Sequence, residues 1–215
     1  FNYKNNINLK LFLKNLSKLQ NRGHDSFGIS YFENDNLNIL TCKGLVKDNS
    51  VELIKSNNKI NTKIMLGHLR YITSGNKIMD NNNIYNYQPI VSKCKYGSYS
   101  LIFNGNIPLH KYNKKFKIDT EMIINYLNTN SSKFNSWELL LTNFIQTFDR
   151  AYIIIILTHD NRLFILNDRY GVRPCVYNYN SNGVVFSSES CVFDNNSKIN
   201  TVNPGELISV NNENI

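Results

Sequence analysis

Several residue types that mark particular classes of protein are scarce in this sequence. Alanine and tryptophan each occur once among 215 residues, and cysteine occurs four times. The cysteines (Cys42, Cys94, Cys175 and Cys191) form no C-x-x-C pair, and the four histidines form no H-x-x-x-H pair. Neither a disulfide scaffold nor a structural zinc site is therefore expected, and reduced thiols are typical of a cytoplasmic protein.

Long apolar segments are missing as well. The longest apolar run, residues 151–157, has the length of a strand, whereas a membrane-spanning helix needs about 20 apolar residues. Residues 1–10 are rich in asparagine and lack the apolar centre of a secretory signal. With no internal repeat and no long linker, the sequence predicts one domain over residues 1–215 and no contact with a membrane.

Acidic residues are outnumbered, with 16 Asp and Glu against 24 Lys and Arg, which gives a net charge of +8. The lysines are dispersed, and the densest group, within residues 111–117, falls in an expected loop. Asparagine fills 38 positions, a bias typical of A/T-rich coding sequence, and we attribute much of the basicity to this bias. Dispersed charge favours a solvated surface, so no nucleic-acid partner is expected.

The apolar pattern predicts an α+β fold. Helices are expected over 8–19 with Asn8 as N-cap, over 51–55, over 119–127 with Asp119 as N-cap, and over 137–147. Strands are expected over 27–31, 37–42, 64–66, 99–103, 152–157, 163–166, 174–179 and 184–187. Short connections between strands require antiparallel pairing, and the apolar run 153–156 indicates a sheet covered on both faces.

Four polar segments could carry chemistry, although each has an ordinary structural explanation when it is taken alone. Arg22 with Gly23 can end a helix, and Arg70 after a strand can form a structural ion pair. Asn104-Gly105 can be a hairpin turn, and Asp119 can be a helix cap.

In combination and in this order, the polar segments resemble the glutaminase domain of class II glutamine amidotransferases, which are N-terminal-nucleophile hydrolases. The matching segments are Arg22-Gly23, Gly67-His68-Leu69-Arg70-Tyr71, Gln88-Pro89, Asn104-Gly105-Asn106, Asp119-Thr120-Glu121, residues 168–174 and Ser188-Glu189-Ser190. Within that class the sequence is most similar to amidophosphoribosyltransferase. The resemblance implies a four-layer αββα sandwich of two antiparallel sheets.

The resemblance also implies how L-glutamine would be bound. Arg70 would hold the α-carboxylate with its planar guanidinium, and Asp119 would hold the α-ammonium group, kept ionised by the helix end. Asn104 and Gly105 would form the oxyanion hole for the amide that is hydrolysed.

Three further residues are expected near the glutamine. Arg22 would help to position the nucleophile. Tyr71 and Thr73 lie at the root of the loop 73–87, which in the family closes over glutamine. No metal and no cofactor are implied.

The nucleophile is where the sequence departs from the family pattern. The family uses an N-terminal cysteine on a short apolar strand, with its own α-amino group as the base, and that strand belongs immediately before Phe1. The four internal cysteines lie on or beside expected strands, where a thiol is usually inert. Two interpretations remain: the strand belongs to an upstream segment of the protein, or the protein is a catalytically inactive glutamine-binding or interaction module.

With its cysteine, such a domain would hydrolyse L-glutamine to glutamate and ammonia. In the family the ammonia aminates phosphoribosyl pyrophosphate in purine synthesis. No phosphoribosyl-pyrophosphate motif is found in the sequence, so the acceptor or synthase domain would lie on another polypeptide or on a lost segment. A homo-oligomer is left open.

Overall fold

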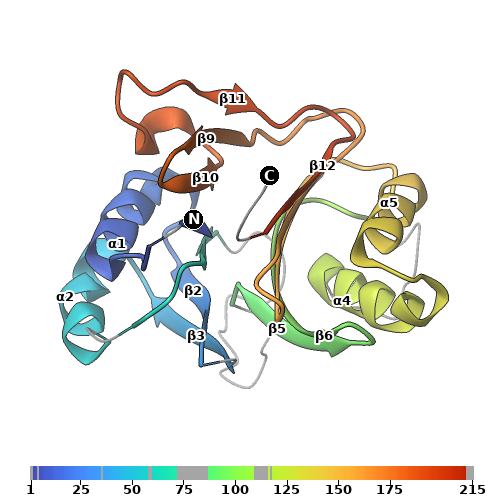
Figure 1. The fold of residues 1–215 in the computed structure, drawn as a ribbon, viewed down its shortest axis with the longest axis horizontal. Coiled ribbons are helices and arrows are strands. Elements are labelled where there is room, and N and C mark those ends of the chain that lie inside the picture. Colours follow the sequence, from blue (N-terminus) through green and yellow to red (C-terminus); the bar gives the residue numbers. More distant parts are fainter. Residues whose placement is uncertain are drawn as a thin grey trace.

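Two antiparallel sheets stacked face to face, each covered by two helices on its outer side, form most of the fold (Figure 1). The computed structural model describes residues 2–3, 5–34, 36–57, 60–71, 87–108, 116 and 118–211. Thr73, most of the loop 73–87 and the lysines of 111–117 lie outside these residues.

The first sheet has three strands in the order β3 (Asn36–Lys43), β2 (Ser26–Glu33) and β4 (Met65–Arg70). Its outer face is covered by α1 (Leu9–Lys18) and α2 (Val46–Ser56). Asn8 caps α1 as predicted, because its side-chain oxygen accepts a hydrogen bond from the Leu11 backbone N–H at 3.1 Å.

The second sheet has five strands in the order β12 (Leu207–Val210), β8 (Leu163–Asn167), β7 (Tyr152–Thr158), β6 (Gly97–Gly105) and β5 (Ile90–Cys94). Its outer face is covered by α4 (Asp119–Asn130) and α5 (Trp137–Thr147). The predicted αββα layers are thus confirmed.

A third sheet lies beside these layers, with the order β1 (Asn2–Tyr3), β10 (Gly183–Ser187), β9 (Val176–Asn180) and β11 (Asn200–Thr201). Short 3-10 helices, η1 (Gln20–Arg22), η3 (Ser131–Lys133) and η4 (Ser190–Val192), connect the elements. Every strand pair in the described part of the chain is antiparallel, as the short connections predicted.

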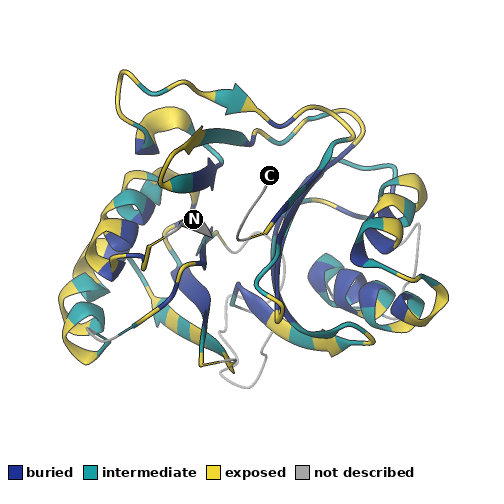
Figure 2. Cartoon of the chain, viewed as in Figure 1, coloured by how far each residue is buried: buried dark blue, intermediate teal, exposed yellow. Residues whose placement is uncertain are grey.

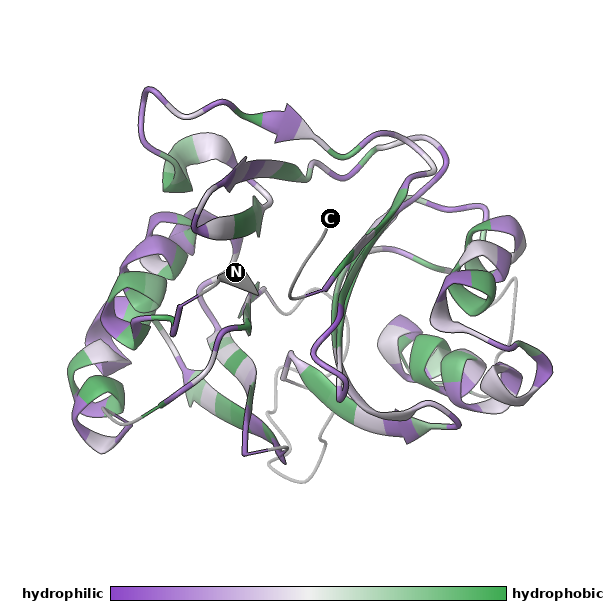
Figure 3. Ribbon diagram, in the orientation of Figure 1, coloured by the Kyte–Doolittle hydropathy of each residue, from purple (hydrophilic) through white to green (hydrophobic). Residues whose placement is uncertain are grey.

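Burial follows the layers (Figure 2), and apolar residues gather on the inner strands and the inward helix faces (Figure 3). One apolar cluster fills the space between the two stacked sheets. Each sheet has one further cluster between its outer face and the two helices that cover it. A polar contact crosses the central layer, where the buried hydroxyl oxygens of Ser30 on β2 and Ser100 on β6 lie 2.5 Å apart.

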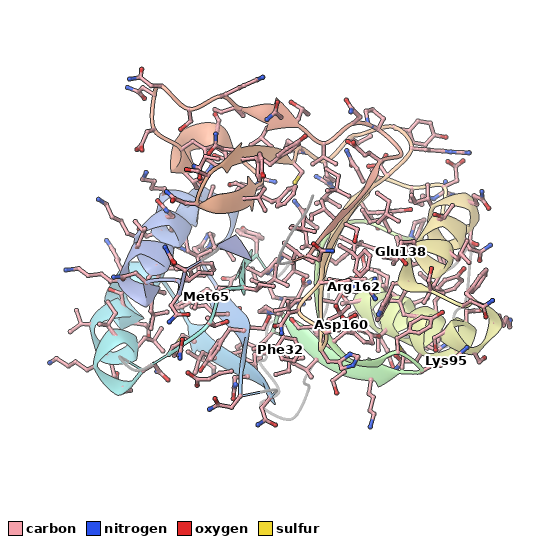
Figure 4. All side chains as sticks on the ribbon, viewed as in Figure 1. Phe32, Met65, Lys95, Glu138, Asp160 and Arg162 are labelled. Atoms are coloured by element: carbon pink, nitrogen blue, oxygen red, sulfur yellow. The ribbon has the colours of Figure 1, made fainter. Side chains whose placement is uncertain are left out.

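An ion-pair group joins the second sheet to helix α5. Arg162 contacts Asp160 at 2.7 Å and Glu138 of α5 at 2.9 Å, and its guanidinium lies 5.0 Å from the ring centre of Phe164 (Figure 4). The group therefore ties α5 to the hairpin between β7 and β8.

Several predicted boundaries need correction. Helix α2 begins at Val46 rather than at residue 51, and β5 and β12 were not predicted. Asp119 is the first residue inside α4, and the residue at the cap position is Ile118, whose side chain cannot accept a hydrogen bond. None of the helices in the described part of the chain combines the length and apolar character that a membrane crossing requires.

Candidate active site

A cavity of about 640 Å³ opens between the stacked sheets and reaches β10. This volume lies in the range of about 300–1,000 Å³ that is typical of small-molecule sites. Six of the seven residues predicted from the sequence line it: Arg22, Arg70, Tyr71, Asn104, Gly105 and Asp119. The seventh, Thr73, lies outside the described residues.

Strand β4 directs Arg70 into the space between the sheets. In the register of β2 with β4, Arg70 lies opposite Ser26 and His68 lies opposite Gly28. Gly67, directly before His68, faces α1, since a Cβ there would approach the Phe12 ring to 2.8 Å, and Leu69 packs in the same cluster as the α1 side chains. Alternation along the strand therefore sends His68 and Arg70 to the cavity side.

Arg70 is a largely buried cation with acidic neighbours. Burial lowers the pKa of Arg70, and the nearby Asp119 and Asp25 carboxylates oppose that shift. A guanidinium remains charged under these conditions, so Arg70 offers a positive, planar hydrogen-bonding group to a ligand.

Asp119 lies on the facing side, at the start of α4. Its Oδ1 accepts a hydrogen bond from the Thr120 N–H at 2.8 Å, and the Ile107 backbone also donates to the carboxylate. Burial nevertheless raises the pKa of Asp119, and the hydrogen bonds and Arg70 offset this only in part. Burial therefore acts against the helix end, which was expected to favour the ionised carboxylate.

Asn104 and Gly105 are the last residues of β6. The Asn106 N–H donates to Ala151 O on the β7 side, and the Phe103 N–H donates to the Gln88 side chain on the opposite side. Backbone groups alternate along a strand, so the Gly105 N–H points away from β7, to the edge of β6 that no described strand covers at this position. Gly105 also has to be glycine, since a Cβ would meet Ala151 O and Tyr152 Cβ at 2.6 Å.

Arg22 and Tyr71 lie at the rim. Arg22 Nε lies 3.6 Å from Glu189 Oε1, and the Asn21 side-chain amide donates to the same oxygen at 2.9 Å. Tyr71 is half-exposed, and its ring packs edge to face against the His24 ring, with 4.7 Å between the two ring centres. The Arg22–Glu189 pair joins the end of α1 to the segment that follows β10.

Sequence reasoning assigned no role to two groups of cavity residues. His68 and Gln88 come from segments that were recognised as motifs, and Arg173, Ser187 and Ser188 come from the motifs near the C-terminus. The signal that could have identified these residues was their position inside the recognised motifs. Which side chains of a motif face inward depends on strand register, which the sequence alone did not give.

The turn that carries Arg173 is organised by the buried carboxylate of Asp168. Its Oδ1 accepts from Tyr170 N–H at 2.8 Å, and its Oδ2 accepts from Tyr152 N–H at 3.0 Å. The main chain is thereby held against β7, and Arg173 is presented to the cavity.

The charged side chains on the described cavity wall are three arginines (Arg22, Arg70 and Arg173) and one aspartate, Asp119. His68 adds no charge near neutral pH, because burial lowers its pKa to about 3. Separated positive and negative groups suit a zwitterionic ligand. Among the described residues no group of three or more His, Cys, Asp or Glu side chains is arranged to hold a metal ion.

Comparison with known proteins agrees with this geometry. A family model described as "Glutamine amidotransferase domain" matches residues 55–209. Amidophosphoribosyltransferase 3, chloroplastic, of Arabidopsis thaliana is 31% identical over 208 residues, which cover 91% of this chain and 37% of the relative. Amidophosphoribosyltransferase of Pyrococcus horikoshii is also 31% identical, over 91% of this chain and 43% of the relative. The chain thus spans about two fifths of the length of these relatives.

Solved structures share the fold. The glutamine phosphoribosylpyrophosphate amidotransferase of B. subtilis has a TM-score of 0.77 at 24% identity and covers 98% of this chain and 46% of its own. A predicted glutamine amidotransferase of Pseudomonas aeruginosa has a TM-score of 0.57 at 13% identity, over 86% of this chain and 84% of its own. Because the family model matches well over half of the chain and the fold agrees, this protein belongs to the glutamine amidotransferase domain family.

Proposed function

We propose that this domain binds L-glutamine and hydrolyses its side-chain amide to glutamate and ammonia. One observation carries the proposal: Arg70 and Asp119 line the same cavity as Asn104 and Gly105, at the open end of β6. Glutamine needs partners for a carboxylate, an ammonium group and an amide, and this wall offers one group for each.

The two charged residues account for binding of the amino-acid end. Arg70 and Asp119 lie close enough for each to shift the pKa of the other. The Arg70 guanidinium can bind a carboxylate through two parallel hydrogen bonds, and the Asp119 carboxylate can accept from an ammonium group. A bound cation next to Asp119 would also stabilise its ionised form against the effect of burial.

The nucleophile is proposed to be a cysteine upstream of Phe1, on a continuation of β1. Asn2 pairs with Val184 and Tyr3 with Gly183, so a strand that continued this register upstream would advance one residue along β10 for each of its own residues. That path leads past Phe186 to Ser187, which both line the cavity. Among the described strands β4 pairs only with β2, so its other edge is available to the same segment.

Hydrolysis would follow the chemistry of an activated thiol. The sulfur attacks the amide carbon of glutamine, and its proton passes through the α-amino group of the cysteine to the departing ammonia. The Asn104 side-chain N–H and the Gly105 backbone N–H would stabilise the oxyanion. Water then attacks the γ-glutamyl thioester, which releases glutamate and restores the thiol.

The acceptor of the ammonia is proposed to be phosphoribosyl pyrophosphate, bound by a synthase domain outside these 215 residues. The names of the relatives support this, since they are amidophosphoribosyltransferases of more than twice this length. A cytoplasmic location and a homo-oligomeric state also stay predictions, and the plant relatives are named chloroplastic.

Glutamate release by the native full-length protein tests the proposal, together with N-terminal sequencing and glutamine calorimetry. Arg70→Lys keeps the charge but removes the planar pair of donors, and we expect about tenfold or more weaker glutamine binding. The matched control is Arg162→Lys, since Arg162 contacts Asp160 and Glu138 away from the cavity wall.

The outcomes separate the two interpretations left open by the sequence. Glutamate release by a chain that begins with cysteine supports the enzyme. Binding without turnover supports the inactive module, and no binding at all removes both.

A further inference from the structure

We propose that Gln88 is a positioning residue that holds the end of β6, and with it the oxyanion hole, by binding the backbone of Phe103. This inference rests on the proposed glutaminase function, because it concerns the same site. It assigns no contact with substrate to Gln88.

The need for such a residue follows from the sheet. Strand β7 pairs with β6 as far as Gly105, but the pairing of β5 with β6 stops at Leu101, opposite Ile90, the first residue of β5. Beyond Leu101, the edge of β6 away from β7 has no strand partner in the described part of the chain. Phe103 and Gly105 direct their backbone groups to this open edge.

Gln88 takes the place of the missing strand at Phe103. Its Oε1 accepts a hydrogen bond from the Phe103 N–H at 2.7 Å, and the residue is only 5% exposed. Gln88 lies two residues before β5 begins, so a side chain continues the pairing where the backbone has turned away.

His68 completes the arrangement from the other sheet. Its imidazole makes a hydrogen bond to the Phe103 backbone, and its buried Nδ1 has no hydrogen-bond partner. The bond is therefore made by Nε2–H to the carbonyl oxygen. Both polar groups of the Phe103 backbone are thus held by side chains, directly before Asn104.

The path of the Gln88 main chain is itself restricted. A Cβ on Gly28 would lie 2.3 Å from the Gln88 carbonyl oxygen. Gly28 on β2 therefore lets Gln88 approach closely. A methyl group at position 28 would move Gln88 without changing its chemistry.

The consequence for catalysis is geometric. An oxyanion-hole donor acts only when it is aimed at the developing charge, and a misplacement of about 1 Å can cost about 100-fold in rate. Release of the Phe103 N–H would loosen the peptides that carry the Asn104 and Gly105 donors. We therefore expect a loss in kcat and little change in KM, because Arg70 and Asp119 bind the other end of glutamine.

Two measurements on the full-length protein test this. The first is amide hydrogen exchange across residues 99–107, which does not depend on activity. Gln88→Met removes the acceptor at similar size, and exchange at 103–106 should rise. The second is the steady-state rate, where we expect kcat to fall about 10- to 100-fold. Gln88→Glu retains an acceptor oxygen, so its amide exchange at 103–106 and its kcat should both lie close to the wild-type values.

Ser131→Ala is the matched control. The Ser131 hydroxyl also accepts from a backbone N–H, that of Lys95, at the opposite end of β5. This variant should lose comparable stability but keep exchange at 103–106 and kcat unchanged. If Gln88→Met folds poorly, Gly28→Ala is the second test. Its methyl group should displace Gln88 and so raise exchange at 103–106 and lower kcat in the same way.

Unchanged exchange at 103–106 in both Gln88→Met and Gly28→Ala would overturn the inference. Equal losses in the Ser131→Ala control would overturn it too, since the effect would then be general destabilisation. If the wild-type protein releases no glutamate, the proposed function fails, while the exchange experiment still decides whether Gln88 holds the end of β6.

Discussion

Acid should destabilise this protein through His68. Burial lowers the pKa of His68 from 6.5 to about 3, the Arg70 charge acts in the same direction, and the bond to Phe103 opposes it. The unfolded chain therefore binds a proton below about pH 6.5 that the folded chain excludes, and the free energy of unfolding falls as the pH falls.

The size of the effect follows from the two pKa values. Between about pH 8 and about pH 5 the contribution of His68 to the free energy of unfolding should decrease by about 2 kcal/mol. This change in free energy depends almost only on the pKa of His68 in the unfolded chain, because His68 in the folded protein stays neutral throughout this pH range.

Urea unfolding at the two pH values measures this difference. His68→Gln removes the titrating group and retains an N–H donor for Phe103, so its stability should change about 2 kcal/mol less over the range than that of the wild type. His24→Gln is the control, because that imidazole is exposed on the surface. Equal pH dependence in the wild type and His68→Gln would refute the reasoning.

Three further predictions concern the site and the central layer. Asn104→Ala should lower kcat for glutamate release about 100- to 1,000-fold, with a smaller change in KM, because it removes one of the two proposed oxyanion donors. Glutamine affinity by calorimetry should fall as the pH falls, beginning at a higher pH than for an exposed aspartate, because burial raises the pKa of Asp119; Asp119→Asn should bind weakly with no such dependence. Ser100→Ala leaves the Ser30 hydroxyl buried without its partner and should cost about 1–3 kcal/mol in urea unfolding, whereas adding Ser30→Ala should cost little more.

The secondary structure was largely predictable where the pattern is local. Helix α5 has the predicted bounds, and α1 begins after the predicted Asn8 cap, because apolar spacing and caps are short-range signals. Strands β5 and β12 were missed, since they are short and depend on pairing with distant segments. Asp119 as a cap was wrong by one residue.

The layered α+β fold, the family and the cavity residues that match its motifs could be predicted from the order of the amino acids, because residue types at fixed spacing carry that information. The burial, the charge environment and the backbone partners of those residues became known from the folded chain alone. Burial raises the pKa of Asp119 against the effect of the helix end. Because β5 starts only at Ile90, Gln88 and His68 are the partners of the Phe103 backbone. Desolvation and strand register arise from contacts between segments far apart in the chain, and no local pattern encodes them.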